Sequence, residues 1–329
     1  MYLHEQYDIL YVIEQAKACA WYRCKVPGAA LGQLGYRVHV TRGVTEDMLR
    51  ASSLVIVQRP AHPHNITALK NAVAMGKRVA IELDDDLWHI DATNPAHRFW
   101  NRHTLGTLEE CIRIVEFVTV TTPALASVVR PLNRNVRVLP NMLPGGAWPS
   151  GEHTDHSPLV VGWSGSPTHF RDLGLIRSVI GQVLDTHPQT VMHIAGTSHV
   201  PFAEHERIVS VPGSEIEHYP SVVGGFDIGL APVIDSRFNR AKSDLKALEY
   251  AMCGIPVIAS AGTYDSLPRD AGFLCKTPAD WLRALSRLIE RPDLRSRMGA
   301  AARTWAESRT IERNVGLWVD AYGLSGGGA

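Results

Sequence analysis

Residues 236–260 read SRFNRAKSDLKALEYAMCGIPVIAS and join a polar loop, a short helix and a buried strand. Leu245, Leu248 and Met252 recur at the spacing of one helix face, and Gly254 is placed to end that helix. The apolar run PVIA that follows is typical of a strand in a parallel sheet. This order of loop, helix and strand predicts an α/β fold.

The start of the predicted helix carries the residue types of an anion site. Ser243 can cap it, Lys242 lies at its mouth and Asp244 lies in its first turn. Unpaired backbone amides and the positive end of the helix dipole face outward there, which suits a phosphate. Glu249 follows about two turns later, where its carboxylate can accept hydrogen bonds from vicinal sugar hydroxyls.

This stretch resembles the nucleotide-binding segment of family 4 glycosyltransferases of the GT-B fold. The match consists of Lys242, Ser243, Lys246, Glu249 and the run AMCGIPV at 251–257. The resemblance implies that Glu249 holds the ribose of a nucleotide-diphosphate sugar and that Ser243, Asp244 and Lys246 also border the donor.

The chain departs from the family pattern at one position. The family has a second Glu eight residues before the first, and this chain has Ala241 there. The contact that this Glu makes to the donor hexose is therefore open, and Asn239, Arg240 or Lys242 can replace it.

Composition describes a globular protein with an ample core. The 329 residues are 45% hydrophobic and 20% charged, and 33 Lys and Arg balance 33 Asp and Glu. The balanced charge gives no electrostatic footprint for nucleic acid. The five cysteines are scattered, which favours neither disulfides nor a zinc site. No apolar run reaches about 18 residues and no signal peptide opens the chain, so we expect no transmembrane segment and a cytoplasmic location.

Strand and helix patterns alternate along both halves, as a parallel sheet requires. We expect strands at 7–13, 36–40, 54–58, 78–83, 117–120, 136–139, 159–163, 190–195, 208–211 and 227–231. We expect helices at 26–34, 65–75, 101–115, 173–184 and 217–223, and one that starts at Pro123 with Thr122 as its cap.

Pro, Gly and polar residues at 144–158 have linker composition. We therefore predict an N-terminal Rossmann-like acceptor domain (1–145), a linker (146–157), a nucleotide-sugar-binding domain (158–305), and a crossover helix and tail (306–329). The GT-B resemblance implies that the two domains face one another across a cleft and that the last helix crosses back to the first.

A small-residue loop follows the strand at 159–163. Gly165 allows close backbone approach, and Ser166, His169 and Arg171 follow it. The resemblance places this loop beside the donor diphosphate, with Arg171 as the first candidate to neutralise its charge and His169 as the second. A nucleophile elbow, G-x-S-x-G, is an alternative, but Ser166 stands at its last position. The dinucleotide fingerprint G-x-G-x-x-G is absent.

The acidic run ELDDDLW at 82–88 ends a predicted strand, and ligands of open α/β sheets bind at such strand ends. Asp84 or Asp85 can orient or deprotonate an acceptor hydroxyl, or the two can hold Mg²⁺. A solvated turn with capping aspartates is the alternative. Short GT-B chains carry a similar D-D-D-L-W run.

Three further residues are acceptor-side candidates: Arg23 near the first helix, and His62 and His64 in the loop after the third strand. The run HRFWNRH at 97–103 mixes bases with aromatic residues, as a single-strand or membrane contact does, or starts a helix whose aromatic residues dock on the core.

The resemblance implies a retaining hexosyltransferase that moves a sugar from a nucleotide-diphosphate sugar to an acceptor hydroxyl of a glycan, protein, small molecule or modified DNA. The predicted catalytic residues are Asp84, Asp85, Lys242 and Arg171. No metal cofactor is required, although Mg²⁺ can assist. The alternatives are a transferase acting on a modified DNA base, a nucleotide-sugar epimerase and a non-catalytic nucleotide-sugar-binding module.

Overall fold

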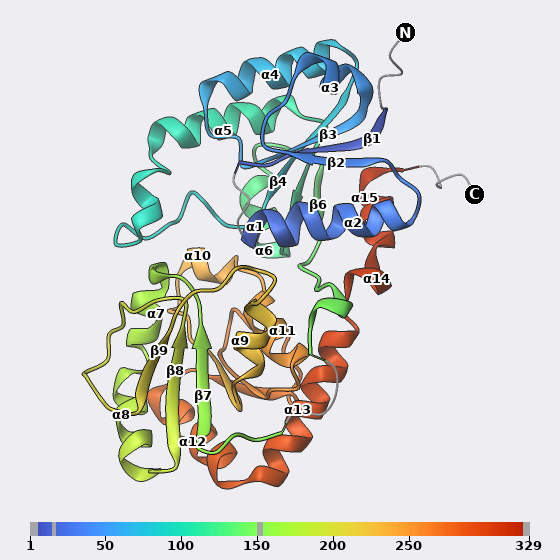
Figure 1. Ribbon diagram of the computed structural model, residues 1–329. Helices are drawn as coiled ribbons and strands as arrows, with labels where there is room; N and C mark the ends of the chain where they lie inside the picture. Colours follow the sequence, from blue (N-terminus) through green and yellow to red (C-terminus); the bar gives the residue numbers. More distant parts are fainter. Residues whose placement is uncertain (1–5, 15–17, 150–153, 325–329) are drawn as a thin grey trace. The chain divides into compact units, whose positions relative to one another are not determined.

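A computed structural model describes residues 6–14, 18–149 and 154–324, which form two compact units (Figure 1). Unit 1 comprises Met1–Met142, Ala241–Ser243 and Ile311–Ala329. Unit 2 comprises Leu143–Arg240 and Asp244–Thr310. The chain therefore enters unit 1 three times, once through the three residues that precede Asp244. The predicted domain limits stay predictions.

Unit 1 is built on a parallel sheet of six strands among the described residues, in the order β2-β1-β3-β4-β5-β6. The strands are β1 (Tyr7–Val12), β2 (Val38–Thr41), β3 (Ser52–Gln58), β4 (Arg78–Leu83), β5 (Phe117–Val120) and β6 (Val136–Val138). The order reverses between β1 and β3. Such a switch point is where open parallel sheets bind ligands, at the carboxyl ends of the strands.

Helices cover the sheet of unit 1 (Figure 1). They are α1 (Ala18–Ala20), α2 (Val26–Gln33), α3 (Glu46–Ala51), α4 (Pro63–Ala74), α5 (Arg102–Ile114), α6 (Pro123–Val129), α14 (Ile311–Asn314) and α15 (Gly316–Tyr322), with a π-helical turn at Trp21–Lys25 and a 3₁₀ turn at Pro95–Arg98. Thr122 caps α6 through the amide of Leu125, as the sequence predicted.

The last helix packs into the core of unit 1. Trp318 and Tyr322 of α15 are buried together with Tyr11 and Phe117, and the hydroxyls of Tyr11 and Tyr322 lie 2.9 Å apart. Burial of apolar side chains therefore stabilises the packing of the C-terminal segment in unit 1.

Unit 2 contains a second six-stranded parallel sheet in its described part, in the order β12-β11-β10-β7-β8-β9. The strands are β7 (Leu159–Ser164), β8 (Thr190–Ala195), β9 (Ile208–Val211), β10 (Ile228–Ala231), β11 (Val257–Ser260) and β12 (Gly272–Cys275). Numbered from β7, this is the Rossmann order read in reverse, with its switch point between β7 and β10.

The helices of unit 2 are α7 (Phe170–Gly174), α8 (Arg177–Thr186), α9 (Tyr219–Gly224), α10 (Arg237–Arg240), α11 (Leu245–Met252), α12 (Pro278–Glu290) and α13 (Pro292–Glu307), with 3₁₀ turns at Gly145–Ala147 and Pro167–His169. Gly254 has φ of 72°, a left-handed conformation that ends α11 as predicted. The prediction that Ser243 caps α11 was wrong: Asp244 is the N-cap residue, and the Ser243 hydroxyl accepts a hydrogen bond from Asn141.

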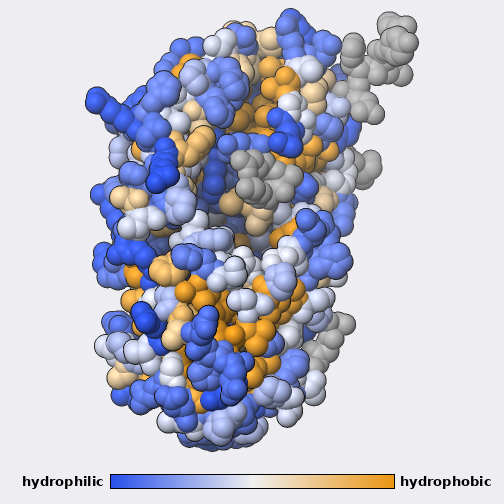
Figure 2. All heavy atoms as spheres, turned by 60° about the vertical axis from the view of Figure 1, so that its left-hand side comes forward, coloured by the Kyte–Doolittle hydropathy of each residue, from blue (hydrophilic) through white to orange (hydrophobic). Residues whose placement is uncertain are grey.

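Two further element predictions differ from the structure. The single helix expected at 173–184 is broken into α7 and α8 around Gly174, and α3 and β12 were not expected. On the face that Figure 2 shows, hydrophilic residues cover much of the surface, and hydrophobic side chains gather over unit 2 in the lower part of the view. Of the helices in the described ranges, none has the length and apolar character needed to cross a membrane.

Candidate functional site

The predicted donor loop of unit 2 leaves the sheet at its switch point. β7 ends at Ser164, whose carbonyl oxygen accepts a hydrogen bond from the ammonium of Lys246. The same ammonium lies 5.0 Å from the ring centroid of Trp163. Lys246 of α11 is thus fixed against the strand end that leads into Gly165, within reach of the loop expected to border a diphosphate.

Gly165 has no room for a side chain. A Cβ there would lie 2.7 Å from the Trp163 ring and 3.2 Å from the Lys246 nitrogen. Gly196, after the neighbouring strand β8, has φ of 91°, and its own Cβ would lie 2.5 Å from the Gly165 carbonyl oxygen. The two glycines bring two backbones together at the carboxyl edge of the sheet.

Glu249 lies in a buried hydroxyl network at the same edge. Its side chain is only 6% exposed, and Tyr219 donates a hydrogen bond of 2.8 Å to Oε2. The Tyr219 oxygen lies 2.7 Å from the Ser164 hydroxyl, and the amide of Ser164 donates to the Tyr250 hydroxyl at 3.1 Å. Burial holds the pKa of the Tyr250 phenol above its usual range. Within the part of the chain that the structure describes, Ser164 therefore hydrogen-bonds to tyrosines and to no histidine, unlike the serine of a nucleophile elbow.

His169 and Asn239 meet at one buried carboxylate. Asp172 accepts from His169 Nδ1 at 2.7 Å, from the Ile234 amide at 2.8 Å and from Asn239 Nδ2 at 3.3 Å. Arg171 is exposed beside this group, and the Ser166 hydroxyl lies 2.6 Å from that of Thr168.

The remaining predicted donor residues are divided between the units. Asp244 belongs to unit 2, where its carboxylate accepts from Arg309 at 3.1 Å and from Ser266 at 2.7 Å. Lys242 and Ser243 belong to unit 1. Thr122 donates to the carbonyl of Ala241 at 2.8 Å, which anchors this three-residue segment in unit 1.

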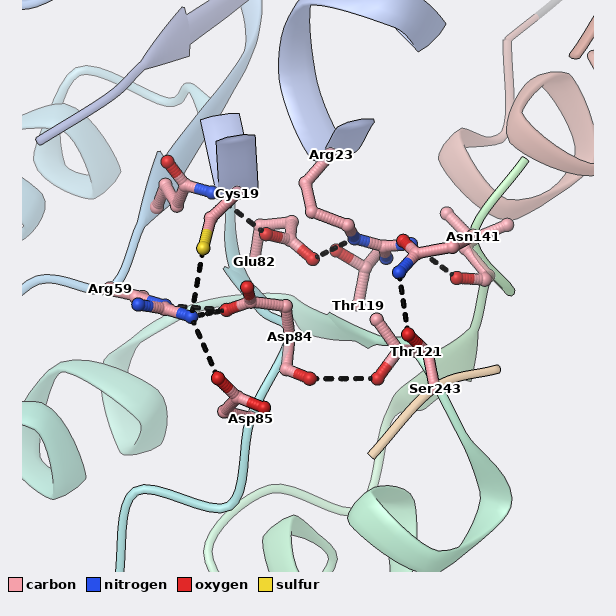
Figure 3. A network of polar contacts seen from close by, with 12 residues as sticks. Cys19, Arg23, Arg59, Glu82, Asp84, Asp85, Thr119, Thr121, Asn141 and Ser243 are labelled. Atoms are coloured by element: carbon pink, nitrogen blue, oxygen red, sulfur yellow. Dashed lines mark hydrogen bonds and ion pairs between the residues drawn. The ribbon is translucent and has the colours of Figure 1, made fainter. Parts of the chain in front are cut away.

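A second polar cluster lies at the switch point of unit 1 (Figure 3). It contains Arg59 after β3, Asp84 and Asp85 after β4, and Cys19 in α1, which follows β1. Arg59 forms an ion pair with Asp84 and another with Asp85 at 3.3 Å, and it donates to the Cys19 sulfur at 3.5 Å. This cluster is neither a solvated turn nor a set of helix caps.

The pKa values of the two aspartates move in opposite directions. Burial raises the pKa of Asp84, but the charge of Arg59 and hydrogen bonds outweigh it, so that this pKa is lowered. Burial and the charge of Asp84 raise the pKa of Asp85, while Lys242 and Arg59 oppose the rise. Burial and Asp84 also raise the pKa of the Cys19 thiol, which keeps it protonated.

The Arg23 guanidinium is bound by groups of unit 1. It is 2% exposed and donates to Glu82 at 2.6 Å, to the carbonyl of Leu139 at 2.6 Å and to Asn141 at 3.0 Å. Asn141 in turn donates to Ser243 at 2.8 Å. These hydrogen bonds link the segment around Arg23 to residues 241–243. The acceptor-side role of Arg23 stays a prediction.

His62 and His64 lie at the start of α4, not in an open loop. His62 is the N-cap residue and its ring stacks on His64 at 5.5 Å. Phe99 contacts the edge of His62, and Trp100 is buried beneath it. Trp100 therefore fits the prediction of a helix start whose aromatic residues dock on the core, whereas Phe99, which is 39% exposed, does not.

No described residues gather into a group of three or more His, Cys, Asp or Glu side chains able to hold a metal ion. At the predicted Asp84 and Asp85 position, the Arg59 guanidinium already supplies the positive charge between the carboxylates. These residues do not fit a divalent cation.

A family model described as glycosyl transferase-like matches residues 177–315, which is less than half of the chain. Curated proteins include no significant sequence match. Among solved structures, sucrose-phosphate synthase from Thermosynechococcus elongatus superposes with a TM-score of 0.71 at 14% identity, over 97% of this chain and 100% of that one. HepE from Anabaena in complex with UDP-glucose gives 0.67 at 13% identity, over 95% and 99%. The fold is GT-B.

A solved structure of a protein with another proposed activity also aligns. A putative UDP-N-acetylglucosamine 2-epimerase from Listeria monocytogenes gives a TM-score of 0.58 at 8% identity, over 98% of both chains. Identities this low establish the fold alone. The glycosyl transferase-like match, which contains the 236–260 stretch, adds support for a glycosyltransferase.

Sequence reasoning missed Arg59, Tyr219 and Asn141 as parts of these sites. Arg59 follows a strand directly before a proline, a position that marks a turn without revealing where the side chain points. Tyr219 begins a helix far from Glu249 in the sequence. The contacts of these residues depend on which strands are neighbours in each sheet, and the local sequence does not reveal that order.

Proposed function

We propose that this protein is a retaining glycosyltransferase that moves a sugar from a nucleotide-diphosphate sugar to an acceptor hydroxyl. The observation that carries the proposal is the position of Glu249 and Lys246, which lie inside the glycosyl transferase-like match, beside Gly165 at the switch point of unit 2. That HepE was solved with UDP-glucose is consistent with a nucleotide-sugar donor here.

The proposed donor site combines a hydrogen-bond acceptor for the ribose with a small-residue loop that the diphosphate can approach closely. Glu249, held by Tyr219, would accept hydrogen bonds from the ribose hydroxyls. Gly165 and Ser166 would let the diphosphate approach the backbone, with Arg171 and Lys246 beside it. The predicted donor set is completed by His169, Ser243, Asp244 and Asn239. Of the three residues that can replace the family's second Glu, Asn239 is the buried one.

In the proposed reaction the acceptor oxygen bonds to the anomeric carbon on the same face from which the diphosphate leaves, while the bond from that carbon to the diphosphate oxygen breaks, so that the anomeric configuration is retained. The electron pair leaves with the diphosphate, and the hydroxyl proton passes to a base. Arg171 and Lys242 would stabilise the charge that develops on the leaving group. Because these cations supply the stabilisation, no metal ion is assigned a step.

Release of nucleoside diphosphate from UDP-glucose, GDP-mannose, ADP-glucose, CDP-glucose and dTDP-glucose, with glycerol as a generic hydroxyl acceptor, tests the proposal. We expect one donor to be consumed. Arg171→Ala and Lys242→Ala should each lose about 2–4 kcal/mol of transition-state stabilisation, a fall of roughly 30- to 900-fold in kcat/KM.

Arg177→Ala is the matched control, since Arg177 is an exposed arginine in the neighbouring helix α8. Wild-type rates in both site variants would show that the site is misplaced. Turnover of the donor without acceptor to an isomeric sugar would favour the epimerase alternative, and binding without turnover would favour a binding module. Salt-sensitive retardation of DNA would favour the modified-base alternative.

A further inference from the structure

Arg59 has a backbone conformation that its residue type disfavours. Its φ of 45° is the one positive φ of a non-glycine residue within the described ranges. Such a conformation is strained in a residue with a side chain and persists only where surrounding contacts hold it. Here the Arg59 amide donates to the carbonyl of Glu82 at 3.2 Å, and the guanidinium is held by the two aspartates.

The two aspartates that hold Arg59 are not equivalent. The Asp84 side chain is 12% exposed and receives the guanidinium through both Nε and Nη2. Thr121 also fixes its backbone carbonyl at 3.0 Å. The Asp85 side chain is 32% exposed and receives one hydrogen bond of 3.3 Å from Arg59. Two nitrogens of Arg59 therefore hold the Asp84 carboxylate at its Oδ1 atom, whereas the Asp85 side chain receives one hydrogen bond and keeps more accessible surface.

We propose that Arg59 is a positioning residue that occupies Asp84 and presents Asp85 to the acceptor hydroxyl. Asp85 then orients that hydroxyl and takes its proton as the oxygen bonds to the anomeric carbon and the bond to the diphosphate breaks. This inference rests on the proposed function and narrows the predicted pair Asp84 and Asp85 to one catalytic carboxylate.

The charges around Asp85 fit this role. Asp84 and Asp86 on its own segment favour its protonated form, while Arg59 after β3 and Lys242 of the 241–243 segment favour its ionised form. Asp86 is fully buried and bonded to His89 at 2.8 Å, so it offers no surface to an acceptor. Asp85 is thus the accessible carboxylate of the three consecutive aspartates.

Carbodiimide coupling of glycine ethyl ester, read by peptide mass spectrometry on the full chain, tests the division without a substrate. In wild type we expect labelling of Asp85 at least tenfold faster than labelling of Asp84. In Arg59→Gln the Asp84 rate should rise toward that of Asp85, and Arg59→Lys should lie between, because lysine keeps the charge without the planar fork.

Exposed Asp91 and buried Asp86 calibrate the labelling, since the first should react and the second should stay unlabelled in every variant. Labelling of Asp86 would identify a variant that has unfolded, and Arg59→Lys then replaces Arg59→Gln. Equal labelling of Asp84 and Asp85 in folded wild type overturns the proposal.

Turnover then tests the catalytic role of Asp85. The assay uses the nucleotide sugar that the nucleotide-release experiment selects as donor, with glycerol as acceptor. Asp85→Asn should lower kcat about 100-fold or more and remove the acidic limb of the pH profile, while Asp84→Asn should keep that limb and move it to lower pH. Arg59→Gln should move it to higher pH. Asp85→Asn within threefold of wild type overturns the proposal.

Nucleotide affinity separates this inference from the proposed function. All four variants should bind the nucleoside diphosphate within threefold of wild type. If wild type consumes no nucleotide sugar, the proposed function fails, and the labelling rates alone then confirm or overturn the division between Asp84 and Asp85. Loss of nucleotide binding in Asp85→Asn would place the donor in unit 1 and overturn both.

Discussion

At the scale of single residues, the buried pair Arg23 and Glu82 shows how charge is handled inside unit 1. Both side chains are at most 2% exposed and their atoms lie 2.6 Å apart. A buried ion pair adds little net stability, but removal of one partner leaves an uncompensated charge. The pair is therefore best understood as fixing the position of the segment around Leu139 and Asn141.

This pair predicts a definite pH dependence of stability. Burial raises the pKa of Glu82 to about 7 against the opposing charge of Arg23. Between about pH 4.5 and 7 the folded state therefore binds more protons than the unfolded state at this site, so its contribution to stability is full below that window and is lost as the pH rises through it. The shift corresponds to about 3 kcal/mol at most.

Urea unfolding of wild type and Glu82→Gln from pH 4 to 8 measures this contribution, since glutamine keeps the shape and removes the titration. The stability advantage of wild type over the variant should shrink as the pH rises. An advantage that stays constant or grows with pH would contradict the assignment.

Residue types predicted some site members and not others. Glu249, Lys246 and Gly165 were proposed because the helix and loop that carry them have local patterns, and their role in a donor site stays a prediction. Arg59 and Tyr219 were missed because their significance depends on partners more than 20 residues away, which no local pattern encodes.

At the scale of elements, two helices meet through a glycine contact. Gly299 of α13 lies so close to α11 that a Cβ would be 2.1 Å from the carbonyl oxygen of Gly254. Gly254 ends α11 directly before the strand β11. The helix that carries Glu249 is thus supported by a backbone contact that tolerates only glycine.

Gly299→Ala should destabilise unit 2 by about 1–3 kcal/mol, because the added methyl overpacks the helix contact. Gly181→Ala in α8 is the matched control, since a Cβ there meets no atom within 4 Å. It should be neutral or stabilise by up to about 1 kcal/mol through helix propensity. Thermal unfolding of both variants checks this, and equal effects of the two substitutions would contradict the packing argument.

The strands were predicted more reliably than the helices. Runs such as 190–195 and 117–120 are short and mostly apolar, and they were located to the residue. The helix at 173–184 was predicted as one piece because its apolar spacing continues across Gly174, although the chain breaks there. Whether a glycine interrupts a helix depends on tertiary packing, which the spacing of apolar residues does not reveal.

At the scale of the whole molecule, the chain builds two sheets of related topology and returns to the first through α14 and α15. Trp318 is 1% exposed in the core of unit 1, while its neighbour Leu317 is 43% exposed. The C-terminal segment is therefore a structural part of unit 1, and unit 2 keeps a core of its own.

Trp318→Ala should cost about 3–5 kcal/mol in unit 1, whereas Leu317→Ala should change stability by less than about 0.5 kcal/mol. Calorimetry should show an earlier transition for unit 1 in the tryptophan variant, with the nucleotide-dependent transition of unit 2 retained. A single transition lowered as a whole would contradict independent cores.

The central claim is that unit 2 binds a nucleoside diphosphate through Glu249. The direct measurement is thermal unfolding with UDP, GDP, ADP, CDP and dTDP, with Mg²⁺ and with EDTA, for wild type, Glu249→Ala and the exposed control Glu290→Ala. A ligand at 100 times its Kd adds about 2.7 kcal/mol. We predict that one nucleotide stabilises wild type and Glu290→Ala but not Glu249→Ala, with or without the metal. Stabilisation of none of the proteins, or of all three equally, would contradict the claim.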